Sequence, residues 1–116
     1  MTTEMTTEHV HILYSTNTRT PYSFYGDLIG EGIFVKGARR GRLVRIYLTP
    51  DGDLVVTRRS WSGDRVGSDH EVCRTLFDVE CWLAGDRKEL HPEEAEAFKK
   101  ADTFVVKFRR ELGLKW

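Results

Sequence analysis

Arginine side chains gather in the middle of this chain, where their guanidinium groups could bind the phosphate or carboxylate groups of a partner. Between positions 36 and 65, the 116-residue sequence holds eight arginines and lysines against three aspartates, although the whole chain is formally neutral. Arginines on a two-stranded ribbon can reach phosphate oxygens, and exposed aromatic rings beside them can stack on bases. The sequence therefore predicts a basic binding surface formed by Arg39, Arg40, Arg45, Tyr47, Arg58, Arg59 and Trp61.

Two other interpretations of the basic segment stay open. Acidic side chains of residues 66–116, a stretch with eleven acids and nine basic residues, could neutralise the arginines within the molecule. Alternatively, the polar face of the segment could be buried against a second copy of the chain, which would then be a structural subunit of a homo-oligomer. The direction in which the arginines point separates these alternatives.

Histidine and cysteine residues suggest an enzymatic alternative. His9 and His11 are two residues apart on a predicted strand and therefore lie on one face, where either could act as a general base. With arginines holding the phosphates, such a protein would be a small enzyme acting on nucleic acid. No third ligand lies near the two histidines, so we predict no metal site. Cys73 falls on the apolar side of a predicted helix and is expected in the core.

Known catalytic and cofactor motifs are incomplete in this sequence. The segment Ser60-Trp61-Ser62-Gly63 lacks the leading glycine of a nucleophile elbow. The segment Gly30-Glu31-Gly32 lacks the third glycine of a dinucleotide-binding loop. We therefore predict neither catalytic residues nor a cofactor.

The basic side chains must be positioned by a β-hairpin. Residues 42–49 and 53–61 flank Pro50-Asp51-Gly52, in which proline fixes φ and glycine supplies the left-handed conformation of a three-residue loop. The face expected in the core consists of Val44, Ile46, Leu48, Leu54 and Val56. The opposite face carries Leu43, Arg45, Tyr47, Val55, Thr57 and Arg59. Arg45 and Arg59 therefore share the more polar face.

Two further segments are predicted to complete an antiparallel sheet of about four strands. Residues 9–14 are apolar and β-branched, as is typical of a strand. Residues 22–36 have the same composition, but three glycines interrupt them at Gly26, Gly30 and Gly32. Since glycines inside a strand mark bulges or sharp bends, we expect one bent strand or two short ones.

Two amphipathic helices are predicted after the hairpin. Ser68-Asp69-His70-Glu71 has the sequence of a capping box, and apolar residues then recur at helical spacing until Gly85. That helix would hold Cys73 and Cys81 about 12 Å apart along its axis, which is too far for a disulfide. The second helix is expected to open at Pro92, which suits a first helical position.

Strands followed by helices indicate an α+β fold, with both C-terminal helices packed on one sheet face. The residues expected to be buried together are Val44, Ile46, Leu48, Val56, Leu76, Leu83, Phe98, Val105 and Phe108. At 40% hydrophobic residues, the chain can form one domain over residues 9–116, after a disordered tail over residues 1–8. The sequence has no leader peptide, no membrane span and two unpaired cysteines, so we expect a cytoplasmic protein without membrane association.

Residues 40–61, RGRLVRIYLTPDGDLVVTRRSW, resemble a hairpin in short uncharacterised proteins of bacterial plasmid, phage and actinobacterial sequences. Tyr47, Thr49, Gly52 and Arg58 stand at the matching positions, and the similar stretch covers about a fifth of the chain. The resemblance implies no known activity. It points to accessory proteins of mobile elements, which act by binding another macromolecule.

These observations favour a small non-enzymatic binding or accessory protein that acts through its basic hairpin. Its partner would be a protein or a nucleic acid, and the sequence does not choose between the two. The nucleic-acid-acting enzyme and the homodimer that uses the polar sheet face are the alternatives.

Overall fold

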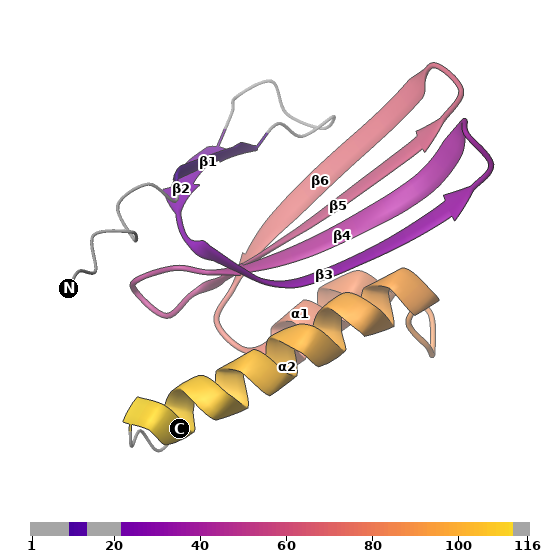
Figure 1. Ribbon diagram of the computed structural model, residues 1–116. Helices are drawn as coiled ribbons and strands as arrows, with labels where there is room; N and C mark the ends of the chain where they lie inside the picture. Colours follow the sequence, from indigo (N-terminus) through magenta and orange to yellow (C-terminus); the bar gives the residue numbers. More distant parts are fainter. Residues whose placement is uncertain (1–9, 14–21, 113–116) are drawn as a thin grey trace.

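A four-stranded antiparallel sheet lies at the centre of the protein, in a computed structural model that describes residues 10–13 and 22–112 (Figure 1). Its strands follow chain order as β3 (Asp27–Lys36), β4 (Arg40–Leu48), β5 (Leu54–Ser62) and β6 (Arg65–Cys73). A separate two-stranded sheet precedes it, made of β1 (Val10–Leu13) and β2 (Tyr22–Tyr25). Two helices follow it, α1 (Leu76–Ala84) and α2 (Pro92–Leu112). This order confirms the α+β prediction. The tail predicted over residues 1–8 lies outside the described residues.

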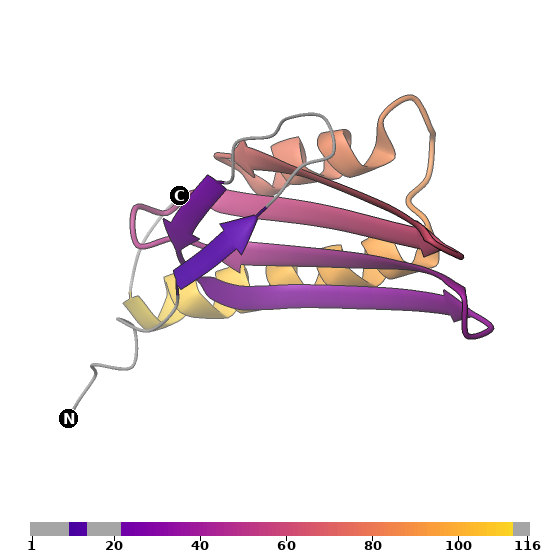
Figure 2. The ribbon, with the colours of Figure 1, turned by 90° about the horizontal axis from the view of Figure 1, so that it is seen from above.

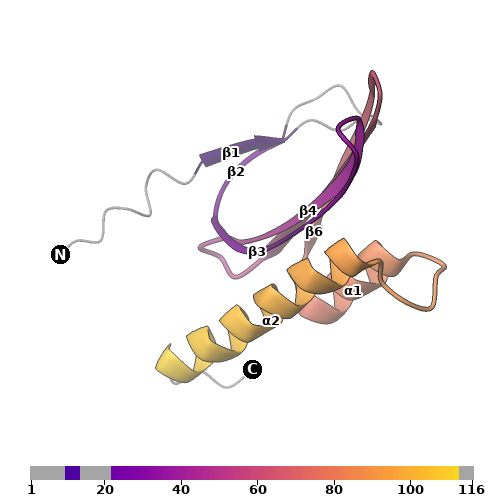
Figure 3. The ribbon, with the colours of Figure 1, turned by 45° about the vertical axis from the view of Figure 1, so that its right-hand side comes forward.

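Both helices cover one face of the curved sheet, and β1 and β2 lie over part of the other (Figure 3). We call the first the helix side and the second the outer face. The end of the sheet that carries the turns at residues 37–39 and 63–64 is called the distal end. The opposite end, with the turn at residues 49–53, is the proximal end. In Figure 2, the β1–β2 hairpin lies over the proximal half.

The predicted hairpin is confirmed in its register. Leu48 pairs with Leu54 across the turn, and Gly52 has a φ of 90°. Val44, Ile46 and Val56 are fully buried on the helix side, because β4 and β5 alternate in polarity as a half-covered sheet requires. On the outer face, Tyr47 and Val55 are buried instead under Phe24 and Tyr22 of β2.

The segment of residues 22–36 is divided into two strands, as expected, with Gly26 between β2 and β3. The β3–β4 register also shifts between Leu28 and Gly30. Gly30 and Gly32 have a second role that the sequence did not reveal. A Cβ atom at Gly30 would overlap the carbonyl oxygen of Ala97, and one at Gly32 would overlap that of Glu93. The two glycines thus let the backbone of α2 approach β3 closely.

The prediction that a helix starts at Ser68 is wrong. Residues 65–73 form β6, in which Ser68 pairs with Arg59 and Glu71 with Val56. The competing signal was the two-residue turn Gly63-Asp64 directly after a strand, which favours a hairpin. Since β5 would otherwise leave a row of backbone donors and acceptors unpaired, its pairing with β6 outweighs the local capping sequence.

Helix α1 begins later than predicted. Its N-cap is Thr75, whose Oγ1 accepts a hydrogen bond of 3.1 Å from the backbone N–H of Asp78. It ends at Gly85, as predicted, with a φ of 58°. Cys73 therefore lies at the end of β6 and only Cys81 lies on α1, so their predicted placement on one helix is also wrong. Both thiols are free.

Most of the predicted core is confirmed on the helix side. Val44, Ile46, Leu48, Val56, Leu83 and Val105 are buried in one cluster, with Leu76 and Phe98 packed against it half-buried. Ala97 and Ala101, which face the glycines of β3, complete the contact with α2. The side chain of Phe108 lies outside the described residues.

Candidate functional site

Positive charge is concentrated at the distal end of the sheet. The backbone N–H of Gly63 donates a hydrogen bond of 2.7 Å to the carbonyl oxygen of Arg39, which joins the two turns. Positions 36–42 and 58–67 hold seven basic residues and one acid, Asp64. The basic residues are Lys36, Arg39, Arg40, Arg42, Arg58, Arg59 and Arg65.

Strand alternation divides these residues between the two sheet faces. Arg40 and Arg42 point to the helix side, because they continue the alternation of buried Val44 on β4. On β5, Arg58 shares the side of Val56, whereas Arg59 points to the outer face. The seven-residue surface predicted from the sequence is therefore not one surface.

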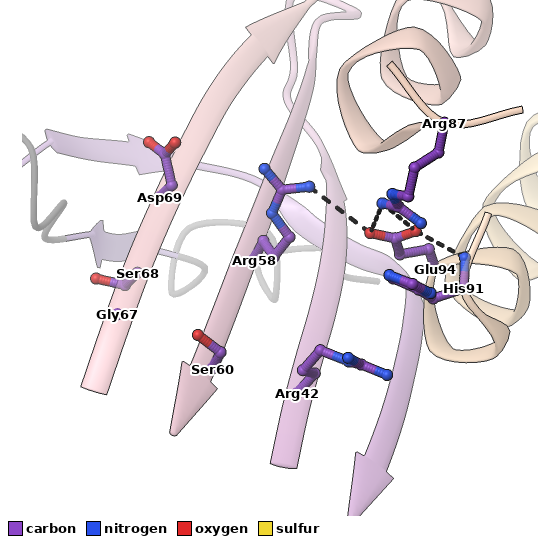
Figure 4. Close-up of a pocket in the computed structure, with 9 residues that line it drawn as sticks. All are labelled: Arg42, Arg58, Ser60, Gly67, Ser68, Asp69, Arg87, His91 and Glu94. Carbon is purple, nitrogen blue, oxygen red and sulfur yellow. Dashed lines mark hydrogen bonds and ion pairs between the residues drawn. The ribbon is translucent and has the colours of Figure 1, made fainter. Parts of the chain in front are cut away.

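Two buried glutamates in the first turn of α2 meet the helix-side arginines. Glu93 and Glu94 are 2% and 1% exposed. Arg87, in the loop between the helices, places Nη2 2.9 Å from both carboxylate oxygens of Glu94 (Figure 4). Nη1 of Arg58 lies 3.6 Å from Oε2 of Glu94. The backbone N–H of His91 also donates to Oε1 of Glu94 at 2.8 Å, so this carboxylate caps the helix start.

Arg42 is less completely engaged than Arg58. Its Nε lies 2.8 Å from Oε2 of Glu93, but the N–H does not point along that line, and Nε is buried without a hydrogen-bond partner. Oε1 of Glu93 is likewise buried and unpartnered. Arg58, by contrast, stacks on the Trp82 ring at 4.4 Å and donates to the carbonyl oxygen of Leu83 at 3.2 Å. Arg58 is thus locked in place, whereas Arg42 retains an unused donor.

Two adjoining hollows form a groove on the helix side of the distal end. The first, of about 340 Å³, lies between the strands and the start of α2 (Figure 4). The second, of about 620 Å³, continues to the ends of the strands. The two share Arg42, Ser60 and Gly67. We call this continuous depression the arginine groove, after the arginines that line it: Arg40, Arg42, Arg58, Arg65 and Arg87.

Small residues form the floor of the groove between these arginines. Ser60 pairs with Gly67, and Ser62 pairs with Arg65. A Cβ atom at Gly67 would meet only the Ser60 hydroxyl, at 3.5 Å, so the floor there is open. The result is a shallow depression with hydroxyl groups at its base and guanidinium groups on its walls. Asp69 and Glu94 also line the first hollow, whereas no acid lines the second, which therefore suits an anion better.

The outer face carries four other residues of the predicted surface, Arg45, Tyr47, Arg59 and Trp61. Nε of Arg45 donates to Oε2 of Glu31 at 2.5 Å, and this hydrogen bond raises the pKa of Arg45. Tyr47 is 5% exposed and lies 4.4 Å from the ring of His11, so it cannot stack on a base. Trp61 lies over Gly41, where its ring fills the space of a side chain. Arg59, by contrast, is exposed on this face.

Sequence reasoning missed several residues of the groove. Extending the alternation of the hairpin strands by two residues would have placed Arg42, Ser60 and Ser62 on the helix side. Interpreting Gly63-Asp64 as a turn would have added Arg65. Arg87 had no local signal, because only the tertiary packing of the interhelical loop brings it to Glu94.

Of the two histidines singled out in the sequence, the structure describes His11, which lies away from the groove. In residues 10–13 and 22–112, no three histidine, cysteine, aspartate or glutamate side chains gather as metal ligands. His9 lies outside this part. Nε2 of His11 donates a hydrogen bond of 2.8 Å to the carbonyl oxygen of Gly26, on the outer side. His91 is the histidine that lines the groove.

None of the helices in the described part of the chain is long and apolar enough to cross a membrane. Comparison with protein-family models, with curated protein sequences and with solved structures found no match to this chain. The functional argument therefore rests on the geometry of the distal end alone.

Proposed function

We propose that this protein is a non-enzymatic binding protein that engages a nucleic acid through the distal end of its sheet. The observation that carries this proposal is uncompensated charge. Among the described residues, five basic side chains at the distal end form no ion pair, and positions 36–42 and 58–67 hold one acid, Asp64, with Asp69 nearby on β6. These five are Lys36, Arg39, Arg40, Arg59 and Arg65.

A polyanion fits this surface better than an acidic protein does. Protein interfaces are usually built around an apolar centre with a polar rim. The arginine groove instead presents guanidinium groups, serine hydroxyls and a glycine, with Asp69 and Glu94 in its first hollow and Trp61 among the residues that line the second. Arginine is also the side chain whose planar donors match phosphate oxygens in pairs.

The test is a fluorescence anisotropy titration of labelled single-stranded DNA, single-stranded RNA and duplex DNA with the full chain. Binding should weaken linearly in log salt, with a slope of about −3 to −4 on duplex if roughly four phosphates are neutralised. A double Lys99→Gln, Lys107→Gln variant, which removes two exposed charges from α2, should leave this slope unchanged. No binding to any of the three probes at micromolar protein and about 50 mM salt would remove nucleic acid as the partner.

The outer face favours a second candidate, a homodimer. Ile33, Val35 and Val66 point to that face beyond the cover of β2 and are 56%, 56% and 49% exposed. Exposed apolar side chains grouped on one face are typical of an interface. Sedimentation equilibrium of the wild type and of Val35→Lys checks this: a dimer should dissociate in the variant, and a monomeric wild type at about 100 μM contradicts the candidate.

A further inference from the structure

We infer that the arginine groove is a phosphate-binding site that holds the sugar–phosphate backbone of the nucleic acid without touching its bases. This inference rests on the proposed function and specifies which of the two sheet faces carries it. It differs from the expectation drawn from the sequence, which favoured Arg45 and Arg59 on the outer face.

The second hollow of the groove is lined by Arg40, Arg42 and Arg65 and by no acidic residue, so it is where an anion would sit. Nε of Arg42 is buried against Glu93, but 39% of the Arg42 side chain is exposed and can meet a ligand there. Arg40 and Arg65 stand on the walls with no ion pair among the described residues, and Ser60 and Ser62 add hydroxyl groups on the floor.

The groove is also held in shape by groups that do not need the ligand. Glu94 fixes Arg87 through two contacts of 2.9 Å and attracts Arg58 (Figure 4). The Arg58 guanidinium also stacks on the Trp82 ring. Because these side chains are already ordered, binding loses little side-chain entropy at this wall. Glu94 is therefore a positioning residue, and Arg40, Arg42 and Arg65 are the side chains that contact phosphate.

The placement of the aromatic rings gives the groove little surface on which bases could stack. Arg58 lies over the Trp82 ring, and Arg42 lies over one face of the Phe34 ring, which is 36% exposed and is not among the residues that line the groove. Trp61 does line the second hollow, but its ring lies over Gly41, whose Cβ position faces the outer side of the sheet. Since single-strand binding proteins obtain much of their affinity from bases stacked on exposed aromatic rings, we expect this site to contact the backbone.

A pair of matched double variants tests which face binds. Arg40→Gln with Arg65→Gln removes two charges from the groove, and Arg39→Gln with Arg59→Gln removes two charges outside it. We expect the groove pair to weaken binding of a 30-nucleotide strand by about tenfold or more at 100 mM salt and to reduce the magnitude of the salt slope by about 1.4, because each phosphate contact on a single strand contributes about 0.7. The outer pair should change affinity less than about threefold, because it acts only through long-range attraction.

The outcomes separate this inference from the proposed function. If the wild type binds no nucleic acid, the proposed function fails and the inference fails with it. If the wild type binds but the outer pair loses as much affinity as the groove pair, nucleic-acid binding stands and the groove is overturned. Both pairs should unfold thermally within about 2 °C of the wild type, because exposed charges contribute little to stability.

A second experiment tests whether the protein recognises the phosphates of the strand or its bases. A strand of abasic residues keeps the phosphates and removes the bases, and we expect it to bind within about twofold of the unmodified strand. A loss of about tenfold or more would overturn recognition of the backbone alone. Inorganic phosphate at about 20 mM, compared with chloride at equal ionic strength, should compete with the strand. Equal binding in the two salts would contradict a phosphate site.

Discussion

The proximal and distal halves of the β4–β5 hairpin have the same continuous pairing but opposite surroundings. In the proximal half, Ile46 and Val56 are buried by the helices, and Tyr47 and Val55 are buried on the outer face by β2. In the distal half, the helix side opens into the arginine groove, and Ile33, Val35 and Val66 are exposed on the outer face. A sheet sealed on both faces at one end can support a charged, open surface at the other.

The boundary between the halves lies at the two buried glutamates. Glu93 and Glu94 are carried into the core by the first turn of α2, and the arginines of the distal half compensate their charge. Buried charges are tolerated only when they are paired. The comparison therefore predicts that substitutions at this boundary and in the proximal half affect stability, whereas those in the distal half affect binding.

The largest effect on stability is expected from Glu94→Ala. Removal of this carboxylate leaves Arg87 and Arg58 without their shared partner and takes the side-chain acceptor from the His91 N–H, so the free energy of unfolding should fall by about 3–5 kcal/mol. Urea denaturation followed by circular dichroism measures it. Glu96→Ala, which removes only an exposed pair with Lys100, is the matched control and should cost less than about 0.5 kcal/mol. Equal losses of stability in Glu94→Ala and Glu96→Ala would contradict the importance of the buried glutamates at the boundary between the two halves.

A smaller effect is expected where α2 approaches β3. Gly32→Ala places a Cβ atom against the Glu93 carbonyl and must push the helix away, which should cost about 1–3 kcal/mol or more. Gly67→Ala is the matched control in the distal half, since it finds open space and replaces a flexible residue in a strand. We expect it to be neutral or to stabilise by about 0.5–1 kcal/mol. Thermal unfolding of both variants measures these changes in stability. A Gly67→Ala protein that is less stable than Gly32→Ala would contradict the prediction that the contact between α2 and β3 is the more sensitive of the two sites.

The smallest effect concerns alkaline pH. Cys73 closes the proximal core, and burial, with a further contribution from Glu71 and Asp78, raises the pKa of its thiol from 9.0 to about 11. Because the unfolded chain releases this proton more readily, the free energy of unfolding should decrease as the pH rises from about 9 to 11. A Cys73→Ala variant should lack this part of the decrease, while Cys81→Ala should keep it. Identical pH profiles for the wild type and Cys73→Ala would contradict the assignment.

The part of the fold that the sequence predicted is the part set by neighbouring residues. The turn at Pro50-Asp51-Gly52, the division of residues 22–36 and the start of α2 at Pro92 each depend on local chemistry. The strand over residues 65–73 was missed because its polar sequence also fits a helix start, and pairing with β5 decided between the two. Local signals cannot rank such alternatives when a partner strand offers more hydrogen bonds.

The sequence predicted which residue types form the candidate site, but not to which face of the sheet all of their side chains point. The sequence located the basic segment and correctly placed Arg45 and Arg59 on one face. It could not show that Glu31 pairs with Arg45, or that Glu93 and Glu94 meet the other face, because these contacts span long separations along the chain. The groove depends on the position of Arg87 and on where the two helices stop covering the sheet. Tertiary packing determines both.

The close contact between α2 and β3 has a consequence for the order of folding. The strands β3 to β6 are joined by short turns, so their pairings close small loops and can form early. Helix α2 follows all of them in the chain, and until it docks on Gly30 and Gly32 the apolar helix side of the meander stays uncovered. During synthesis the chain therefore passes through a stage with an exposed apolar sheet, at which association with other chains competes with folding.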